Sequence, residues 1–207
     1  MSDFSVTLPA DILRAVAIAC SAEETRYYLQ GVSVEPDGAT SHLVATDGHR
    51  LMVARVEAII PGEKFIIPAD AIARALKGHK APGIELARRG DAWQLGDTLF
   101  RPIDGSFPAW HRVMPDLTSK GELAQFDSGY LESFRKAAAL IGGRASHPHL
   151  HHCGASPAVV TFWGRDNIFG LCMPRRSDDA RDVAALRFLI DGMTRKATDA
   201  AARVAAE

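Results

Sequence analysis

The sequence predicts an α+β fold made of three copies of one unit, each with one helix and about four antiparallel strands. The motif at residues 8–15 recurs at 67–75 and, more weakly, at 126–134, so the copies start a constant 59 residues apart. After each copy come short runs in which apolar and polar residues alternate, as in half-buried strands. A period this long, with so few copies, favours duplicated units packed together over an open solenoid.

Each copy is expected to run from a short strand into a helix. Pro9 and Pro68 are tolerated in a first helical turn, and Asp11 and Asp70 suit the positive end of a helix dipole. Apolar residues at matched places should give each helix one buried stripe: Leu13 and Val16, Ile72 and Ala75, Leu131 and Phe134. The predicted strands are 4–8, 28–34, 42–45 and 51–56, then 64–67, 84–87, 92–95 and 99–103, then 123–126, 149–152, 158–162 and 168–173.

Composition limits the class of protein. The 207 residues are 47% hydrophobic and 24% charged with a formal net charge of −1, so there is no global basic signature of a strong nucleic-acid binder. Three cysteines form no CxxC pair, which fits a reducing cytosol. The first residues lack a signal peptide's features, and no apolar run approaches the ~20 residues that span a bilayer. We therefore expect a cytoplasmic protein with no membrane partner.

Residues 46–51, Thr-Asp-Gly-His-Arg-Leu, form the most informative stretch. They lie between two alternating runs, 41–45 and 51–55, so the Asp-Gly pair predicts a β-hairpin whose glycine adopts a positive φ. Most hairpins of this kind only reverse the chain, so this one carries no function by itself. Two further segments, 25–29 and 104–115, have to be considered together with this hairpin before a function can be inferred.

Together these three segments closely resemble the middle domain of the bacterial replicative sliding clamp, the beta subunit of DNA polymerase III. The resemblance implies a DNA-clamp-like fold in which 1–118 form a complete clamp domain. Residues 119–176 resemble the second half of the family's last domain, closing on Met-Pro-x-Arg at 173–176. Beyond it, Val183, Leu186, Ile190 and Met193 fall at helical spacing, so 177–207 are expected to form an amphipathic helical extension that packs on the body, covers the pocket or mediates self-association.

The resemblance also implies a pocket for linear motifs of DNA polymerases or repair proteins. An apolar cup accepts leucine or phenylalanine anchors, arginines donate to carbonyls and acidic flanks, and methionine repacks around varied partners. Arg175 stands where the family often has an apolar residue, which would make one wall more polar. The expected pocket residues are Leu29, Thr46, Gly48, His49, Arg50, Leu51, Pro108, Arg112, Val113, Met173, Pro174 and Arg176.

A clamp would hold duplex DNA through basic side chains on its inner helices, by contacts to the backbone. Basic residues on a solvent-facing helix are usually only solvated, and aromatic residues in a strand are usually core, so this assignment competes with a structural one. Four chains of one and a half domains could also close a ring, which makes a homo-oligomer that encircles DNA the alternative function. The DNA-contact candidates are Arg14, Tyr27, Tyr28, Arg74, Lys77, Arg135 and Lys136.

A histidine-rich stretch at 147–153 is not explained by the resemblance. On a strand, His149, His151 and Cys153 would point to one face, and imidazole and thiolate are ligands that zinc prefers. A metal-binding hydrolase on a clamp-like scaffold is therefore the alternative from another class. No catalytic constellation or cofactor motif supports it. The sequence predicts a non-enzymatic protein of DNA replication or repair, a reduced processivity factor or a competitor of the full clamp.

Overall fold

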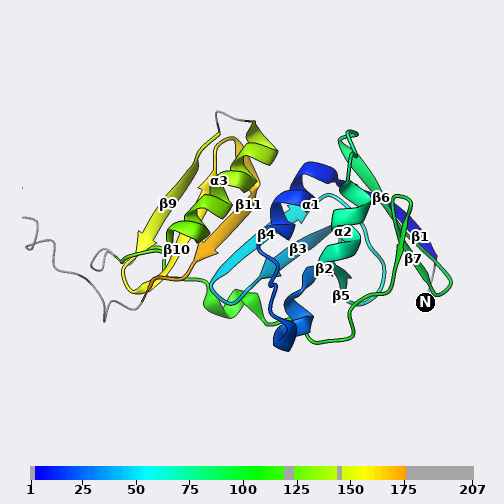
Figure 1. The fold of residues 1–207 in the computed structure, drawn as a ribbon, viewed down its shortest axis with the longest axis horizontal. Coiled ribbons are helices and arrows are strands. Elements are labelled where there is room, and N and C mark those ends of the chain that lie inside the picture. Colours follow the sequence, from blue (N-terminus) through cyan, green and yellow to red (C-terminus); the bar gives the residue numbers. More distant parts are fainter. Residues whose placement is uncertain (1–2, 119–123, 144–145, 176–207) are drawn as a thin grey trace, which may run out of the picture. The chain divides into compact units, whose positions relative to one another are not determined.

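The computed structural model describes residues 3–118, 124–143 and 146–175 (Figure 1). These residues form three α-helices, two short 3₁₀ helices and eleven strands. The helical extension expected at 177–207, with Val183, Leu186, Ile190 and Met193 on one face, lies outside the described residues, as does Arg176.

The first two units exchange their first strands. Strand β1 of the first unit pairs with β6 of the second, while β5 of the second pairs with β2 of the first, antiparallel in both cases. Each unit therefore completes the sheet of the other. The first unit comprises β1 (Phe4–Pro9), α1 (Ala10–Ala17), η1 (Glu24–Leu29), β2 (Gly31–Asp37), β3 (Thr40–Thr46) and β4 (Arg50–Val56). The second comprises β5 (Phe65–Pro68), α2 (Ala69–Leu76), β6 (Gly83–Arg89), β7 (Ala92–Leu95) and β8 (Thr98–Phe100).

The third unit extends one of these two sheets. Its last strand pairs antiparallel with β4, which gives a four-stranded sheet β1-β6-β7-β8 and a seven-stranded sheet β5-β2-β3-β4-β11-β10-β9 (Figure 1). Residues from 1–118 and from 119–176 thus share one sheet, and the division into these domains stays a prediction. The remaining elements are η2 (Trp110–Val113), α3 (Ser128–Gly142), β9 (Pro148–Cys153), β10 (Ser156–Phe162) and β11 (Arg165–Cys172).

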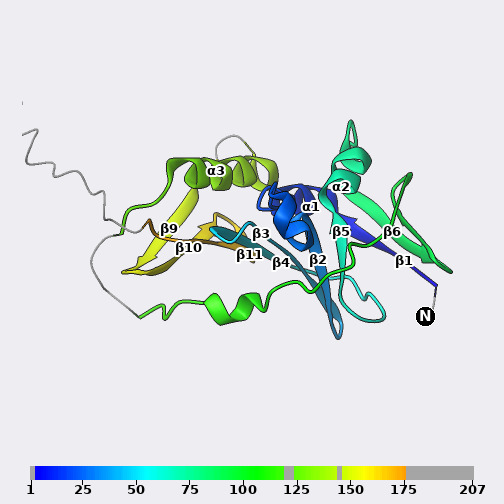
Figure 2. The ribbon, with the colours of Figure 1, turned by 60° about the horizontal axis from the view of Figure 1, so that its bottom comes forward.

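The three helices lie along one face of the sheets, with α1 between α2 and α3 (Figure 2). Pro9 and Pro68 directly precede α1 and α2, one position before the first turn expected for them, and Asp11 and Asp70 lie in the first turns as predicted. The apolar stripes of the helices meet the sheets in one core. Its largest fully buried side chains include Leu8, Ile12, Leu13, Leu43, Ile67, Leu86, Leu95 and Phe134.

Helix α3 packs directly on β11 because position 170 is a glycine. A Cβ atom there would collide with the ring of Phe134 and would lie 3.2 Å from the backbone oxygen of Leu51. The Phe134 ring fills this space and is 1% exposed. This close approach fixes the third unit against β4.

Three strand predictions were wrong in part. Residues 28–30 are not extended, because η1 runs to Leu29 and β2 starts at Gly31. Residues 101–103 leave the sheet after β8, and the Ile103 amide donates to the Ile66 carbonyl, which covers the edge of β5. In the third unit, the described residues 124–126 make a single bridge, Gln125 to Arg175, in place of the predicted strand.

One helix prediction was also wrong. Leu131 on α3 was expected to be buried like its counterparts, Leu13 and Ile72, but it is 36% exposed. The two counterparts are 0% and 2% exposed. The third unit therefore has less cover than the first two.

Candidate functional site

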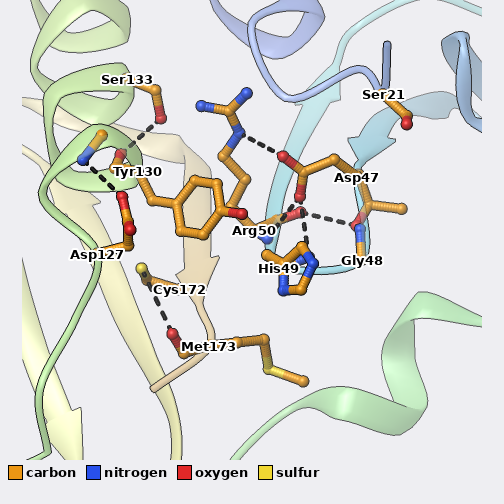
Figure 3. Close-up of polar contacts among 12 residues, drawn as sticks. Ser21, Asp47, Gly48, His49, Arg50, Asp127, Tyr130, Ser133, Cys172 and Met173 are labelled. Atoms are coloured by element: carbon orange, nitrogen blue, oxygen red, sulfur yellow. Dashed lines mark hydrogen bonds and ion pairs between the residues drawn. The ribbon is translucent and has the colours of Figure 1, made fainter. Parts of the chain in front are cut away.

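The Asp-Gly turn between β3 and β4 is rigidly built. Asp47 Oδ1 accepts hydrogen bonds from the amides of His49 and Arg50, each at 2.9 Å (Figure 3). Thr46 Oγ1 donates to the Arg50 carbonyl at 2.7 Å and accepts from the Gly48 amide at 3.0 Å. Gly48 has a φ of 91°, a conformation that glycine adopts without strain, as predicted for this hairpin.

The end of β11 lies directly beside this turn. The Met173 amide donates to the His49 carbonyl at 2.8 Å, and in the ladder Cys172 is opposite Arg50. Figure 3 shows Met173 below the turn, on the strand that passes Tyr130 of α3. The two elements singled out in the sequence, with Met173 124 residues after His49, thus form one site.

A cavity of about 280 Å³ opens where these elements meet the segment around η2. Its surface is mainly apolar, and it is open to solvent on one side. It is lined by Arg26, Tyr28, Leu29, Thr46, Gly48, Arg50, Leu51, Pro108, Ala109, Trp110, Val113, Leu171 and Met173. Most residues expected from the sequence are in this set, but His49, Arg112 and Pro174 are not.

Five lining residues were missed: Arg26, Tyr28, Ala109, Trp110 and Leu171. The segments singled out in the sequence contain four of them, so proximity to the expected residues was the available signal. Trp110 is held in place by its indole N–H, which donates to Glu35 Oε2 at 3.1 Å. Arg26 reaches the turn, where its Nη1 donates to the Asp47 carbonyl at 3.4 Å.

A charged and aromatic cluster stands beside the cavity. The Arg50 Nε atom lies 3.0 Å from Asp47 Oδ2, and the Arg50 guanidinium lies 5.4 Å from the centre of the Tyr130 ring. The imidazole of His49 stacks on the same ring at 5.6 Å with 11° between the planes (Figure 3). These contacts hold Arg50 at the cavity wall and hold His49 against α3, which explains why His49 does not line the cavity.

Three groups in and around this cluster have raised pKa values. Burial raises the pKa of the Tyr130 hydroxyl, and the carboxylates of Asp47 and Asp127 raise it further. Burial also raises the pKa of the Cys172 thiol to about 11 and that of the Cys20 thiol to about 12. All three groups are therefore neutral near pH 7, and the thiols are poor nucleophiles there.

The DNA-contact candidates are less available than the sequence implied. The Arg14 guanidinium donates to the carbonyls of Leu76 and His79, at 3.0 and 2.5 Å, so it joins α1 to the end of α2. Arg74 pairs with Asp70, and Arg135 pairs with Glu132. Lys77, which follows the end of α2, and Lys136 on α3 are exposed. Of the tyrosines, Tyr27 is 53% exposed and meets Tyr28 edge to face.

The histidine stretch does not form the predicted metal site. Cys153 is buried and its Sγ faces the His151 carbonyl at 3.7 Å, while His151 Nε2 lies 3.0 Å from Thr161 Oγ1. The ring of His149 lies against Trp163. Among residues 3–118, 124–143 and 146–175, no group of three or more His, Cys, Asp or Glu side chains could hold a metal ion. The hydrolase alternative therefore has no centre in this part of the chain.

Helices along one face of two sheets are the arrangement expected of a DNA clamp, and solved structures bear out this class of fold. A sliding clamp from Pseudomonas aeruginosa, solved with a ligand, has a TM-score of 0.62 at 20% identity and covers 83% of this chain and 66% of that one. The sliding clamp of Bartonella birtlesii, solved bound to griselimycin, has the same TM-score, identity and coverage. These structures show the fold.

Sequence comparison shows the family. Residues 6–108 match the family described as DNA polymerase III beta subunit, central domain. The beta sliding clamp of Salmonella typhimurium is 30% identical over 151 residues, which cover 67% of this chain and 41% of that protein. The chain therefore belongs to the beta sliding clamp family, which agrees with the expectation of a protein that is not an enzyme. It spans about 41% of the length of this relative. No helix in the described ranges is long and apolar enough to cross a membrane.

Proposed function

We propose that the protein docks linear motifs of DNA polymerases or repair factors in the cavity between the Asp-Gly turn and the end of β11. The observation that carries this proposal is that an open, mainly apolar cavity lies where these two elements meet. Apolar pockets with a few placed polar groups are the usual form of such sites. The family that residues 6–108 match, the DNA polymerase III beta subunit, supports a partner in DNA replication.

The cavity offers a distinct contact to each part of a peptide. Leu51 and Leu171 form an apolar floor for a leucine or phenylalanine anchor. Val113 and Met173, 41% and 36% exposed, stand at the rim, where methionine can repack around different anchors. Gly48 has no side chain, so the backbone of the guest can approach the turn closely.

Docking of client motifs is compatible with two biological roles. A protein that holds client motifs serves either as a reduced processivity factor or as a competitor of the full clamp. Addition of the protein to a primer-extension reaction that contains a polymerase and a full clamp separates these roles. A competitor shortens the products, whereas a processivity factor lengthens them when the full clamp is left out.

A labelled peptide with a clamp-binding motif tests the docking step by fluorescence anisotropy. Val113→Asp and Met173→Asp each place a charge at the apolar rim, where neither side chain is fully buried, so both variants should fold. We expect each to weaken binding about tenfold or more, because a charge in an apolar cup loses its hydration. Ile59→Asp, on a side chain that is 66% exposed and away from the cavity, is the matched control. Equal affinity for all four proteins would contradict the proposal.

A further inference from the structure

Among the described residues, the outer edge of β9 has no partner strand, whereas the equivalent edge in the second unit is covered. In the second unit, β6 is the first strand after the helix, and β1 of the first unit pairs along its outer side. In the third unit, β9 has the same place, but among the described residues it pairs with β10 alone. An uncovered edge presents unpaired backbone groups that can bind another strand.

Apolar side chains are exposed at this edge where the covered edge buries them. Leu150 of β9 is opposite Val160, a core residue, so it faces the helix side of the sheet, yet it is 40% exposed. In the second unit, Leu86 of β6 is opposite Leu95 and beside Val6 of β1, and it is 0% exposed. The exposed fractions of these two leucines therefore differ because β1 covers the edge of β6, whereas no described strand covers the edge of β9.

Helix α3 shows the same lack of cover. Leu131 is 36% exposed on its surface. Helix α3 packs against α1 on one side, as α2 does on the other. Exposed apolar side chains that gather at one edge mark an interaction surface.

We propose that β9 and the adjoining surface of α3 bind the third unit of a second copy of this chain. The occupant follows from the exchange seen inside the chain, where two units of one kind complete each other reciprocally, β1 beside β6 and β5 beside β2. Reciprocal exchange is what a twofold axis requires of two identical surfaces. The segment 124–126, which precedes α3 as β5 precedes α2, lies along β9 of the other copy. Its Phe126 is half-buried, whereas its counterparts Leu8 and Ile67 are 0% exposed.

Sedimentation equilibrium of the full chain over a range of concentrations tests this interface. We expect a reversible dimer, and we expect Leu150→Arg and Leu131→Arg each to weaken it about tenfold or more. Ile59→Arg, on an equally accessible apolar side chain outside the surface, should leave the dimer unchanged. Leu99→Arg is a second control, because Leu99 is 67% exposed on β8, the open edge of the other sheet. Peptide binding at the cavity should be unchanged in all four variants, so a failure here is separate from a failure of the docking proposal.

Hydrogen exchange on the unmodified protein gives a readout that needs no variant. The amides within 149–152 that point away from β10 should exchange more slowly at high than at low protein concentration, since the second copy would pair with them. A chain that stays monomeric, a dimer that survives Leu150→Arg, or one that only Leu99→Arg dissociates would each overturn the proposal. Protection of the 149–152 amides that is independent of protein concentration would overturn the proposal as well, because the edge of β9 would then be covered by a segment of the same chain.

Discussion

Leu13, Ile72 and Leu131 occupy the same place in three copies of one unit, but their surroundings differ. The first two are buried between units that exchange strands, whereas the third lies on a unit that has a neighbour on one side. The same local pattern thus gives a core residue in one region and a surface residue in another. The difference is made by which strands and helices lie next to each copy.

The third unit also depends more on local interactions within its own helix than the first two units do. Helix α3 spans 15 residues, whereas α1 and α2 span 8 each. Its first turn is capped by Asp127, whose side chain accepts a hydrogen bond from the Gly129 amide at 2.8 Å. The residues before α1 and α2 make no side-chain cap bond. Paired units are stabilised chiefly by packing, while the single unit adds local devices.

The largest expected effect separates Leu13 from Leu131. Leu13→Ala should lower the free energy of unfolding by about 2–5 kcal/mol, because it leaves a cavity in the core. Leu131→Ala should lower it by less than about 1 kcal/mol, since that side chain is partly in water. Chemical denaturation measures both, at concentrations low enough to keep the chain monomeric. Equal losses would show that the two positions have the same surroundings after all.

The next effect concerns the contact that holds α3 on β11. Gly170→Ala should cost about 1–3 kcal/mol, because the new methyl group meets the ring of Phe134. Phe134→Leu shortens that ring side chain, so the double variant should lose less than the sum of the two single variants. A double-mutant cycle from denaturation curves measures this coupling. Strictly additive losses would contradict the close contact between α3 and β11.

Much of the fold could be predicted because its signals are local. The repeated helix starts, the Asp-Gly hairpin and most strands follow from periodicity and turn residues near each other in the sequence. The strand exchange could not be predicted in this way, because alternation shows that a strand exists and not which strand pairs with it. The exposure of Leu131 could not be predicted either, because the residues around it follow the same apolar pattern as those around Leu13.

For the functional site, the family resemblance identified lining residues that the pattern of apolar and polar residues alone would not have identified. Gly48 and Met173 come from distant segments, and nothing local in either predicts that they line one cavity. Tyr28 and Trp110 were missed as lining residues because their place depends on how the segment after β8 folds back across the sheet. Arg14 was predicted to contact DNA, but its partners are backbone carbonyls 62 and 65 residues away, which no sequence motif announces.

The smallest effect concerns two thiols, one from each region: Cys20 follows α1, and Cys172 ends β11. An ordinary thiol has a pKa of 9.0, and burial raises that of Cys172 to about 11 and that of Cys20 to about 12. Between pH 9 and 10 the thiolate fraction of each buried thiol should therefore still rise about tenfold, whereas that of an ordinary thiol rises less than about twofold. Alkylation rates followed by mass spectrometry should show this for the folded protein, with the chain unfolded in guanidinium as the control.

Because the raised pKa keeps the proton on the folded protein, the two thiols favour the folded state below pH 9 and lose this contribution as the pH rises toward 11. Rates in the folded protein that level off near pH 9 would show that water reaches both sulfur atoms, and the junction between the first unit and the third would then be more open than the structure has it.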